Sequence, residues 1–250
     1  MQWIQSKHLR GHFQNLRNLE IISIEAFTQD CMDASLDAAL FGAAILTAGF
    51  WSLQSCTLWG PFCLGTAAAL LPRTLEELDL TKMGPPTVLR LSAFKRYDKL
   101  QSLTMCCTDD GTPAVKFWLD SCLSCLKSLH LDSNFCCTTN GRNASDCLPS
   151  ISHLQVRIMA DDLGVNLAMT LFGLESLREL CLFFKGRSGR PFELTVPASS
   201  SLNKVLIVGP ELAAMSVFIQ KRNLHFDCRN VCCVASPSHM SLLSFSKMRL

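Results

Sequence analysis

The chain lacks the features that would direct it into a membrane, out of the cell or onto a nucleic acid. Its net charge is only +2 and it has no block of Lys and Arg, which argues against binding nucleic acid or anionic membranes by bulk charge. The longest apolar run, Ala38–Trp51, falls short of the roughly 20 residues of a membrane span and favours a buried helix. The polar start does not resemble a signal peptide. We therefore predict a cytoplasmic or nuclear protein with no membrane or nucleic-acid partner.

Catalytic motifs are missing as well. The sequence contains no G-x-S-x-G, no P-loop, no G-x-G-x-x-G and no H-E-x-x-H. Two acidic pairs, Asp109-Asp110 and Asp161-Asp162, lie between predicted strands and predicted helices, where carboxylates stabilise a helix N-terminus. We predict a non-enzymatic protein without catalytic residues or cofactors, and we assign both pairs a structural role.

The fourteen cysteines are expected to be free thiols, because nothing in the sequence indicates secretion. Adjacent pairs occur, as at Cys136-Cys137, and we expect one thiol of each pair to be buried because neighbouring strand residues point to opposite faces. Cys122-x-x-Cys125 has the spacing of a zinc site, with Cys136, Cys137 and Cys147 further on. No second C-x-x-C or H-x-x-x-H follows at the usual distance, so we predict no metal and keep a zinc site as the alternative.

A histidine pair is a second candidate for metal binding. His130 and His153 are expected on adjacent strands, facing the same surface. Two imidazoles can hold a metal ion only with further ligands, and the sequence shows no third ligand nearby. We therefore predict that neither histidine binds a metal.

The sequence does contain a repeat. Residues Leu126–Asn134 read L-x-x-L-x-L-x-x-N, in which Leu129 and Leu131 fall on one side of a short strand. The same apolar spacing recurs in segments that begin at Leu16, Leu53, Leu75, Leu100, Leu126, Ile151, Leu177 and Leu202. After steps of 37 and 22 residues, the remaining five steps are all 25 or 26 residues, which chance does not readily produce. Each segment predicts a strand, and a degenerate ninth unit follows at Leu224-His225-Phe226.

The connections between strands are predicted to be mostly helical. Thr112–Cys125 and Asp161–Leu174 carry apolar residues at helical spacing, and Met32–Phe50 is a longer Ala-rich segment that would explain the 37-residue step. Gly186–Ser201, rich in Gly, Pro and Ser, is expected to be irregular.

Since one strand and one connection cannot bury their own apolar face, the units must stack. We predict an α/β leucine-rich repeat solenoid, curved, with a parallel sheet on the concave side and helices on the convex side. Its domain would span residues 1–225, with about eight repeats and an insertion near 28–50, followed by a tail or imperfect cap over 226–250. Neither end shows an obvious cap, so a fragment of a longer array remains the alternative.

The repeat resembles those of intracellular leucine-rich repeat proteins, and its period is similar to that of the cysteine-containing subfamily found in F-box proteins. Leu119–Leu131 looks like that family's helix-end cysteine followed by a strand, and Leu71–Leu80 carries the L-P-x-x-L-x-x-L-x-L wording. The resemblance covers roughly residues 13–210. Only Asn134 holds the ninth-position Asn or Cys, and no F-box segment is present. The resemblance implies protein binding, with substrate recognition in an F-box-type ubiquitin-ligase adaptor as the alternative.

The residues between the buried leucines are predicted to face out of the concave sheet. They are acidic in the early strands, contain His, Gln and Arg in the middle, and end in apolar residues, with Phe183 and Leu206 as expected anchors. The predicted partner-binding residues are Glu77, Asp79, His130, Asp132, Gln155, Arg157, Phe183 and Leu206. A merely solvated strand face, or apolar residues covered by the tail, is the alternative. We expect the partner to be another protein, and the chain to be a monomer unless its terminal repeats pair.

Overall fold

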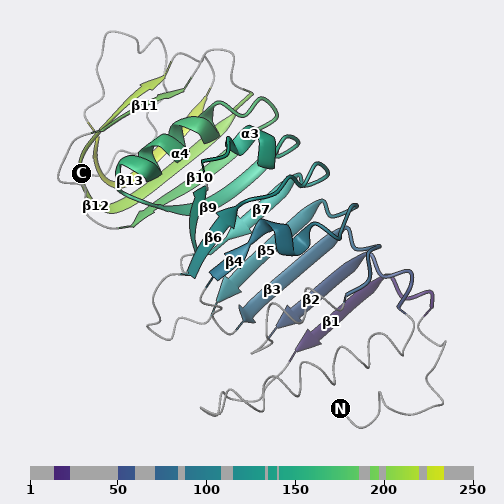
Figure 1. Ribbon diagram of the computed structural model, residues 1–250. Coiled ribbons are helices and arrows are strands. Elements are labelled where there is room, and N and C mark those ends of the chain that lie inside the picture. Colours follow the sequence, from purple (N-terminus) through teal and green to yellow (C-terminus); the bar gives the residue numbers. More distant parts are fainter. Residues whose placement is uncertain are drawn as a thin grey trace.

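A ten-stranded parallel sheet runs along the length of the molecule (Figure 1). The computed structural model describes residues 14–22, 50–59, 71–83, 88–107, 115–132, 135–139, 141–185, 192–196, 201–219 and 224–233. The strands lie in the order β1-β2-β3-β5-β7-β9-β10-β12-β11, and β13 also pairs with β12. Their bounds are β1 (Asn18–Ile22), β2 (Ser55–Trp59), β3 (Glu77–Met83), β5 (Ser102–Cys107), β7 (Ser128–Leu131), β9 (His153–Met159), β10 (Glu179–Lys185), β11 (Phe192–Val196), β12 (Lys204–Ile219) and β13 (His225–Cys233).

All eight strands predicted from the repeat are present in the sheet. Leu129 and Leu131 of β7 are buried, and Ser128 and His130, which alternate with them, are partly exposed, as a two-residue period requires. Leu126 is buried in the turn before the strand, where its N–H donates to the carbonyl oxygen of Leu123 at 3.2 Å. The apolar spacing therefore specifies both the strand and the turn that leads into it.

Backbone hydrogen bonds hold the starts of the strands at one level. The carbonyl oxygen of Lys127 accepts from the N–H groups of Ser152 and His153 at 2.8 and 3.0 Å. The carbonyl oxygen of Gln101 accepts in the same way from Lys127 and Ser128. Because this bond pair recurs at the same position of the repeat, equivalent residues of neighbouring strands lie side by side.

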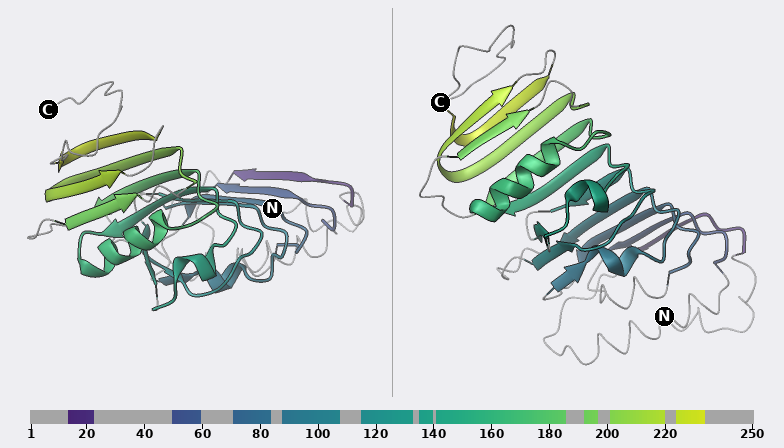
Figure 2. Two further views of the ribbon diagram at one scale, coloured as in Figure 1. Left: turned by 90° about the horizontal axis from the view of Figure 1, so that it is seen from above. Right: turned by 45° about the horizontal axis from the view of Figure 1, so that its top comes forward.

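A second layer covers one face of the large sheet (Figure 2). It contains a three-stranded parallel sheet of β4 (Val88–Arg90), β6 (Val115–Leu119) and β8 (Phe135–Thr139), in the order β4-β6-β8. It also holds the 3-10 helix η3 (Leu91–Phe94) and the helices α3 (Ala144–Cys147) and α4 (Asp162–Phe172). The fold is thus α/β, with a large parallel sheet and few helices among the described residues.

The helix predicted over Thr112–Cys125 is wrong, because its centre is the strand β6. Val115, Phe117 and Leu119 are buried while Lys116 is exposed, which is the two-residue alternation of a strand. The apolar residues of this segment fit a helical period as well, so periodicity alone could not decide. The valine and the aromatic residues favour the strand.

The helix predicted over Asp161–Leu174 is confirmed as α4. Its N-cap is Asp161, whose Oδ1 accepts from the N–H of Gly164 at 2.8 Å, so the structural role predicted for this carboxylate is also confirmed. Leu167, Leu171 and Phe172 are buried against the sheet. Residues 32–49 of the helix predicted over Met32–Phe50, and the acidic pair at 109–110, lie outside the described residues. None of the described helices is long and apolar enough to cross a membrane.

The C-terminal end of the sheet extends beyond the predicted repeats. β13 pairs with β12 in parallel through His225–Cys233, so a strand is present at the start of the tail or imperfect cap predicted over 226–250, of which residues 234–250 lie outside the described ranges. β12 itself reaches Ile219 and pairs with β11 near its end. β11 lies within the connection that was expected to be irregular, and no helix is described there. The degenerate unit at Leu224-His225-Phe226 therefore does contribute a strand.

Candidate functional site

The candidate site is the open face of the large sheet, which we define as the face opposite the second layer. Its residues are those that alternate with the buried ones, and each is half-buried or exposed. One row consists of Asn18, Ser55, Glu77, Ser102, Ser128, His153, Glu179, Lys204 and His225. The next consists of Glu20, Thr57, Asp79, Thr104, His130, Gln155, Cys181, Leu206 and Asp227. The eight predicted partner-binding residues are thus on strands of this face, or directly beside one in the case of Asp132.

The acidic part of the open face lies on β3. Glu77 is exposed and Asp79 half-buried, two residues apart and on the same side of the strand. Asp79 Oδ1 accepts from the Thr81 hydroxyl at 2.7 Å. Next to them, at the strand start, Glu76 accepts from the side chains of Gln54 at 3.1 Å and Gln101 at 3.4 Å. The carboxylate of Glu76 is therefore used within the sheet, whereas no ion pair of Glu77 is found in the described part of the chain.

The centre of the open face is a hydrogen-bonded pair. His130 Nε2 and Gln155 Nε2 lie 2.8 Å apart across β7 and β9. An amide nitrogen only donates, so His130 Nε2 accepts and the ring is neutral in this arrangement. Burial lowers the pKa of His130, opposed by the carboxylates of Asp132 and Asp79, and this favours the same neutral form. The structure thus brings His130 and Gln155 together, with Asp132 close enough to influence the imidazole.

The apolar part of the open face lies on β10 and β12. Phe183 is opposite Val208 in the register, and Leu206 is opposite Cys181, so Phe183 and Leu206 are diagonal neighbours. Arg157 of β9 is opposite Phe183 on its other side. Phe183, Leu206 and Val208 are all only half-buried. The two predicted anchors therefore belong to one apolar patch bordered by an arginine.

A charged row at the start of these strands was not among the predicted partner-binding residues. Glu179 lies between His153 and Lys204, with His153 Nε2 at 3.8 Å and Lys204 Nζ at 3.4 Å from its carboxylate oxygens. About half of each of the three side chains is exposed. Exposed ion pairs of this kind add at most about 1 kcal/mol to stability, so the row contributes more to the charge of the surface than to the fold.

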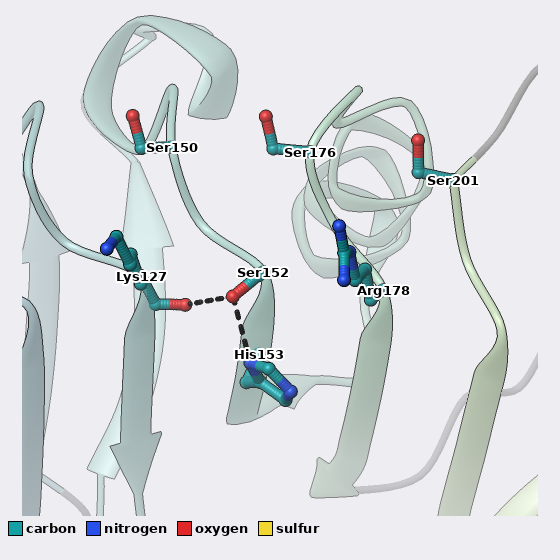
Figure 3. Close-up of a pocket in the computed structure, with 7 residues that line it drawn as sticks. All are labelled: Lys127, Ser150, Ser152, His153, Ser176, Arg178 and Ser201. Atoms are coloured by element: carbon teal, nitrogen blue, oxygen red, sulfur yellow. Dashed lines mark hydrogen bonds between the residues drawn. The ribbon is translucent and has the colours of Figure 1, made fainter.

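The same strands form a hollow of about 420 Å³ at the sheet edge where the strands begin (Figure 3). Its lining consists of Lys127, Ser150, Ser152, His153, Ser176, Arg178 and Ser201. Of these residues, the sequence singled out His153 alone, as half of a possible metal-binding pair. A signal was present, because three consecutive repeats place a serine directly before their first apolar residue, at Ser150, Ser176 and Ser201.

The cysteines form no metal site within the described ranges. Cys122 and Cys125 are exposed, and Cys147 is buried with its Sγ donating to the carbonyl oxygen of Leu119 at 3.5 Å. No group of three or more His, Cys, Asp or Glu side chains there could hold a metal ion. His130 and His153 do share the open face on adjacent strands, but each is hydrogen-bonded to another side chain, at Gln155 and Ser152.

One expectation for the cysteine pairs is wrong, since Cys136 and Cys137 are both buried. Cys137 faces the core, and Cys136 on the other side of β8 is covered near the end of β9, where its sulfur contacts the backbone of Met159. Burial raises the pKa of both thiols, and it raises that of Cys56 to about 12. These thiols are protonated at neutral pH and do not act as nucleophiles.

Comparison with known proteins adds no assignment to this geometry. No family model, no curated protein and no solved structure matches the chain. The argument for a function therefore starts from the open face and from the hollow beside it.

Proposed function

We propose that this chain is a leucine-rich repeat solenoid that acts as a non-enzymatic protein-interaction module, with the open face as its concave binding surface. The observation that carries the proposal is the in-register arrangement of outward residues, which places an apolar patch beside polar rows across consecutive strands. Protein interfaces combine a few apolar or aromatic anchors with a polar surround that excludes water. Solenoids present extended concave surfaces that suit a protein partner.

The predicted residues take different roles in this proposal. Phe183 and Leu206 would be the anchors, because a partner would bury apolar surface that is now half exposed to water. Arg157 borders the patch and would orient an acidic group of the partner. Glu77 and Asp79, several strands away, would select a basic group and give the partner its direction along the sheet.

The neutral pair of His130 and Gln155 would contact the partner between these two ends. Its members are already hydrogen-bonded to each other, so they lose little side-chain freedom on binding. Asp132 directly follows β7, and its N–H donates to the carbonyl oxygen of Met105 at 3.0 Å, which fixes its backbone. The centre of the proposed surface is thus preorganised.

The test is a substitution on the apolar patch. Partners would first be captured from a cell lysate with the full chain and identified by mass spectrometry. Phe183→Asp and Leu206→Asp should each reduce capture of the strongest partner at least tenfold, because each places a charge in the buried interface. A tenfold loss of affinity corresponds to about 1.4 kcal/mol of binding free energy. Far-UV circular dichroism should be unchanged because neither side chain belongs to the core.

A matched control is available on the opposite face. Leu163 is an exposed apolar residue on α4, with 77% of its surface accessible, and Leu163→Asp makes the same chemical change away from the open face. Capture should survive in this variant. Equal loss in Leu163→Asp, or full capture by both open-face variants, would contradict the proposed binding surface.

A further inference from the structure

The hollow at the start of β7, β9, β10 and β12 has the chemistry of an anion site. Its seven lining residues include one arginine, one lysine, one histidine and four serines, and none is acidic. In Figure 3 the hydroxyl groups of Ser150, Ser176 and Ser201 point to the same side, and the guanidinium of Arg178 lies at the start of β10. Hydroxyl groups and a guanidinium are the donors that proteins use to bind phosphate oxygens.

The turns before the strands explain why the serines line up. The N–H of Ile151 donates to the carbonyl oxygen of Leu148, and that of Leu177 donates to Leu174, so two consecutive strands follow the same four-residue turn. Ser150 and Ser176 occupy the third position of these turns. Their spacing therefore follows the spacing of the strands, about 4.8 Å, which is a suitable separation for donors to different oxygens of one tetrahedral anion.

Several donors in the hollow have no competing partner within the described part of the chain. The hydroxyls of Ser150 and Ser201 make no hydrogen bond there, and the guanidinium of Arg178 has neither a hydrogen bond nor an ion pair. Ser176 already donates to the carbonyl oxygen of Pro149 at 3.2 Å, so it is left as an acceptor or must reorient.

The residues at the equivalent position in earlier repeats are used differently. Gln54 donates to Glu76, Gln101 donates to Glu76, and Lys127 Nζ donates to Gln101 Oε1 at 2.9 Å. Ser152 donates instead to the carbonyl oxygen of Lys127 at 3.0 Å, and its oxygen accepts from His153 Nδ1 at 2.8 Å. The polar ladder thus ends before Arg178, which leaves the guanidinium available to a ligand.

We infer that this hollow binds a phosphate group carried by a phosphorylated side chain of the partner protein. The peptide source is favoured because the hollow borders the open face through His153, so a chain lying on that face can extend into it. A volume of about 420 Å³ is also larger than a phosphate ion alone would need, and leaves space for the residue that carries it. Glu179 lies beside the hollow, but it is paired with Lys204 and His153. The peptide source rests on the proposed function, whereas phosphate binding itself does not.

Phosphate binding is testable without knowing the partner. Amide signals of the full chain would be followed by nuclear magnetic resonance during addition of inorganic phosphate, up to about 50 mM, at constant ionic strength set with chloride. We expect saturable shifts at Ser150, Ser152 and Arg178. The short peptide Ac-Gly-phosphoserine-Gly-amide should produce the same shifts at lower concentration, and its unphosphorylated form should produce none.

Two variants and one control make the test specific. Arg178→Gln should weaken phosphate binding about tenfold or more, because the variant loses the charged group that would donate hydrogen bonds to the phosphate. The variant Ser150→Ala should weaken it with no change in net charge or in circular dichroism. Arg17→Gln is the matched control, because Arg17 occupies the same repeat position directly before β1, away from the hollow. It should bind phosphate like the parent chain.

Each alternative outcome overturns the inference. No saturable shift with phosphate, or equal weakening by Arg178→Gln and Arg17→Gln, would show that the hollow is not a phosphate site. Binding of inorganic phosphate without binding of the phosphopeptide would assign the hollow to a free anion and exclude the peptide source. These results are independent of Phe183→Asp and Leu206→Asp, so the proposed binding surface can fail or stand separately.

Discussion

The strand β6 makes the sharpest prediction about the fold, because the sequence favoured a helix there. Phe117 is fully buried and its ring meets that of Phe135 on β8 edge to face, with centroids 6.5 Å apart and an interplanar angle of 89°. Truncating a buried Phe to Ala costs about 3–5 kcal/mol, and an aromatic pair of this geometry contributes about 0.5–1.5 kcal/mol beyond the buried area. We expect Phe117→Ala to lower the free energy of unfolding by about 4 kcal/mol.

The assay is urea unfolding, followed by circular dichroism and by tryptophan fluorescence. Trp118, the next residue of β6, is half-buried and reports on this sheet directly, although other tryptophans also contribute. Repeat arrays can lose two-state behaviour, so the two signals must coincide before one free energy is derived. Phe117→Leu should cost less than Phe117→Ala, because it keeps most of the buried volume.

The control for β6 is its exposed neighbour. Lys116→Ala should change stability by no more than about 0.5 kcal/mol. A loss below about 1 kcal/mol in Phe117→Ala, or a larger loss in Lys116→Ala, would refute the assignment of Phe117 to the buried side of a strand. If this segment were a helix, Phe117 and Lys116 would not have to lie on opposite faces, so the two substitutions would not have to differ in their loss of stability.

Three further predictions follow from single contacts. Asp161→Ala should lower the free energy of unfolding by about 1 kcal/mol through loss of the N-cap of α4, and Asp161→Asn should retain most of it, as measured by thermal unfolding. The folded-state pKa of His130 is lowered, so the unfolded chain binds more protons below the unfolded pKa of about 6.5. Stability should therefore fall as the pH drops below that value, and less so in His130→Gln. With iodoacetamide at pH 8, Cys122 should be alkylated in the folded chain and Cys56 should not, as mass spectrometry of peptides would show.

The strands of the large sheet were predictable because their leucines have one structural task. Leu103, Leu129 and Leu154 occupy equivalent places, and each must be buried for its unit to stack. The connections lack such a constraint. Val115, Phe117 and Leu119 could satisfy burial in a strand or a helix, so tertiary pairing with β8 decided their structure. Asp161 was predictable because capping is a local interaction.

The functional surfaces show the same difference between local and non-local information. The direction in which Phe183 and Leu206 face follows from their parity within a strand, so the repeat alone was sufficient to place both on the open face. The hydrogen bond between His130 and Gln155 depends on the register between β7 and β9, which neither strand's sequence specifies by itself. The hollow around Arg178 required the turn geometry too, since Ser150 and Ser176 precede their strands.

The distribution of polar bonds along the sheet argues that recognition is concentrated at the C-terminal strands. At the strand starts, Gln54, Glu76, Gln101 and Lys127 bond to one another from β2 to β7. Groups that already have partners gain little from a ligand, because binding would exchange one hydrogen bond for another. Directly before β10, the guanidinium of Arg178 has no such bond within the described residues, and Phe183 on β10 is half exposed. The two proposed contacts therefore lie on β10 and directly before it, and a partner of a single extended segment can reach both.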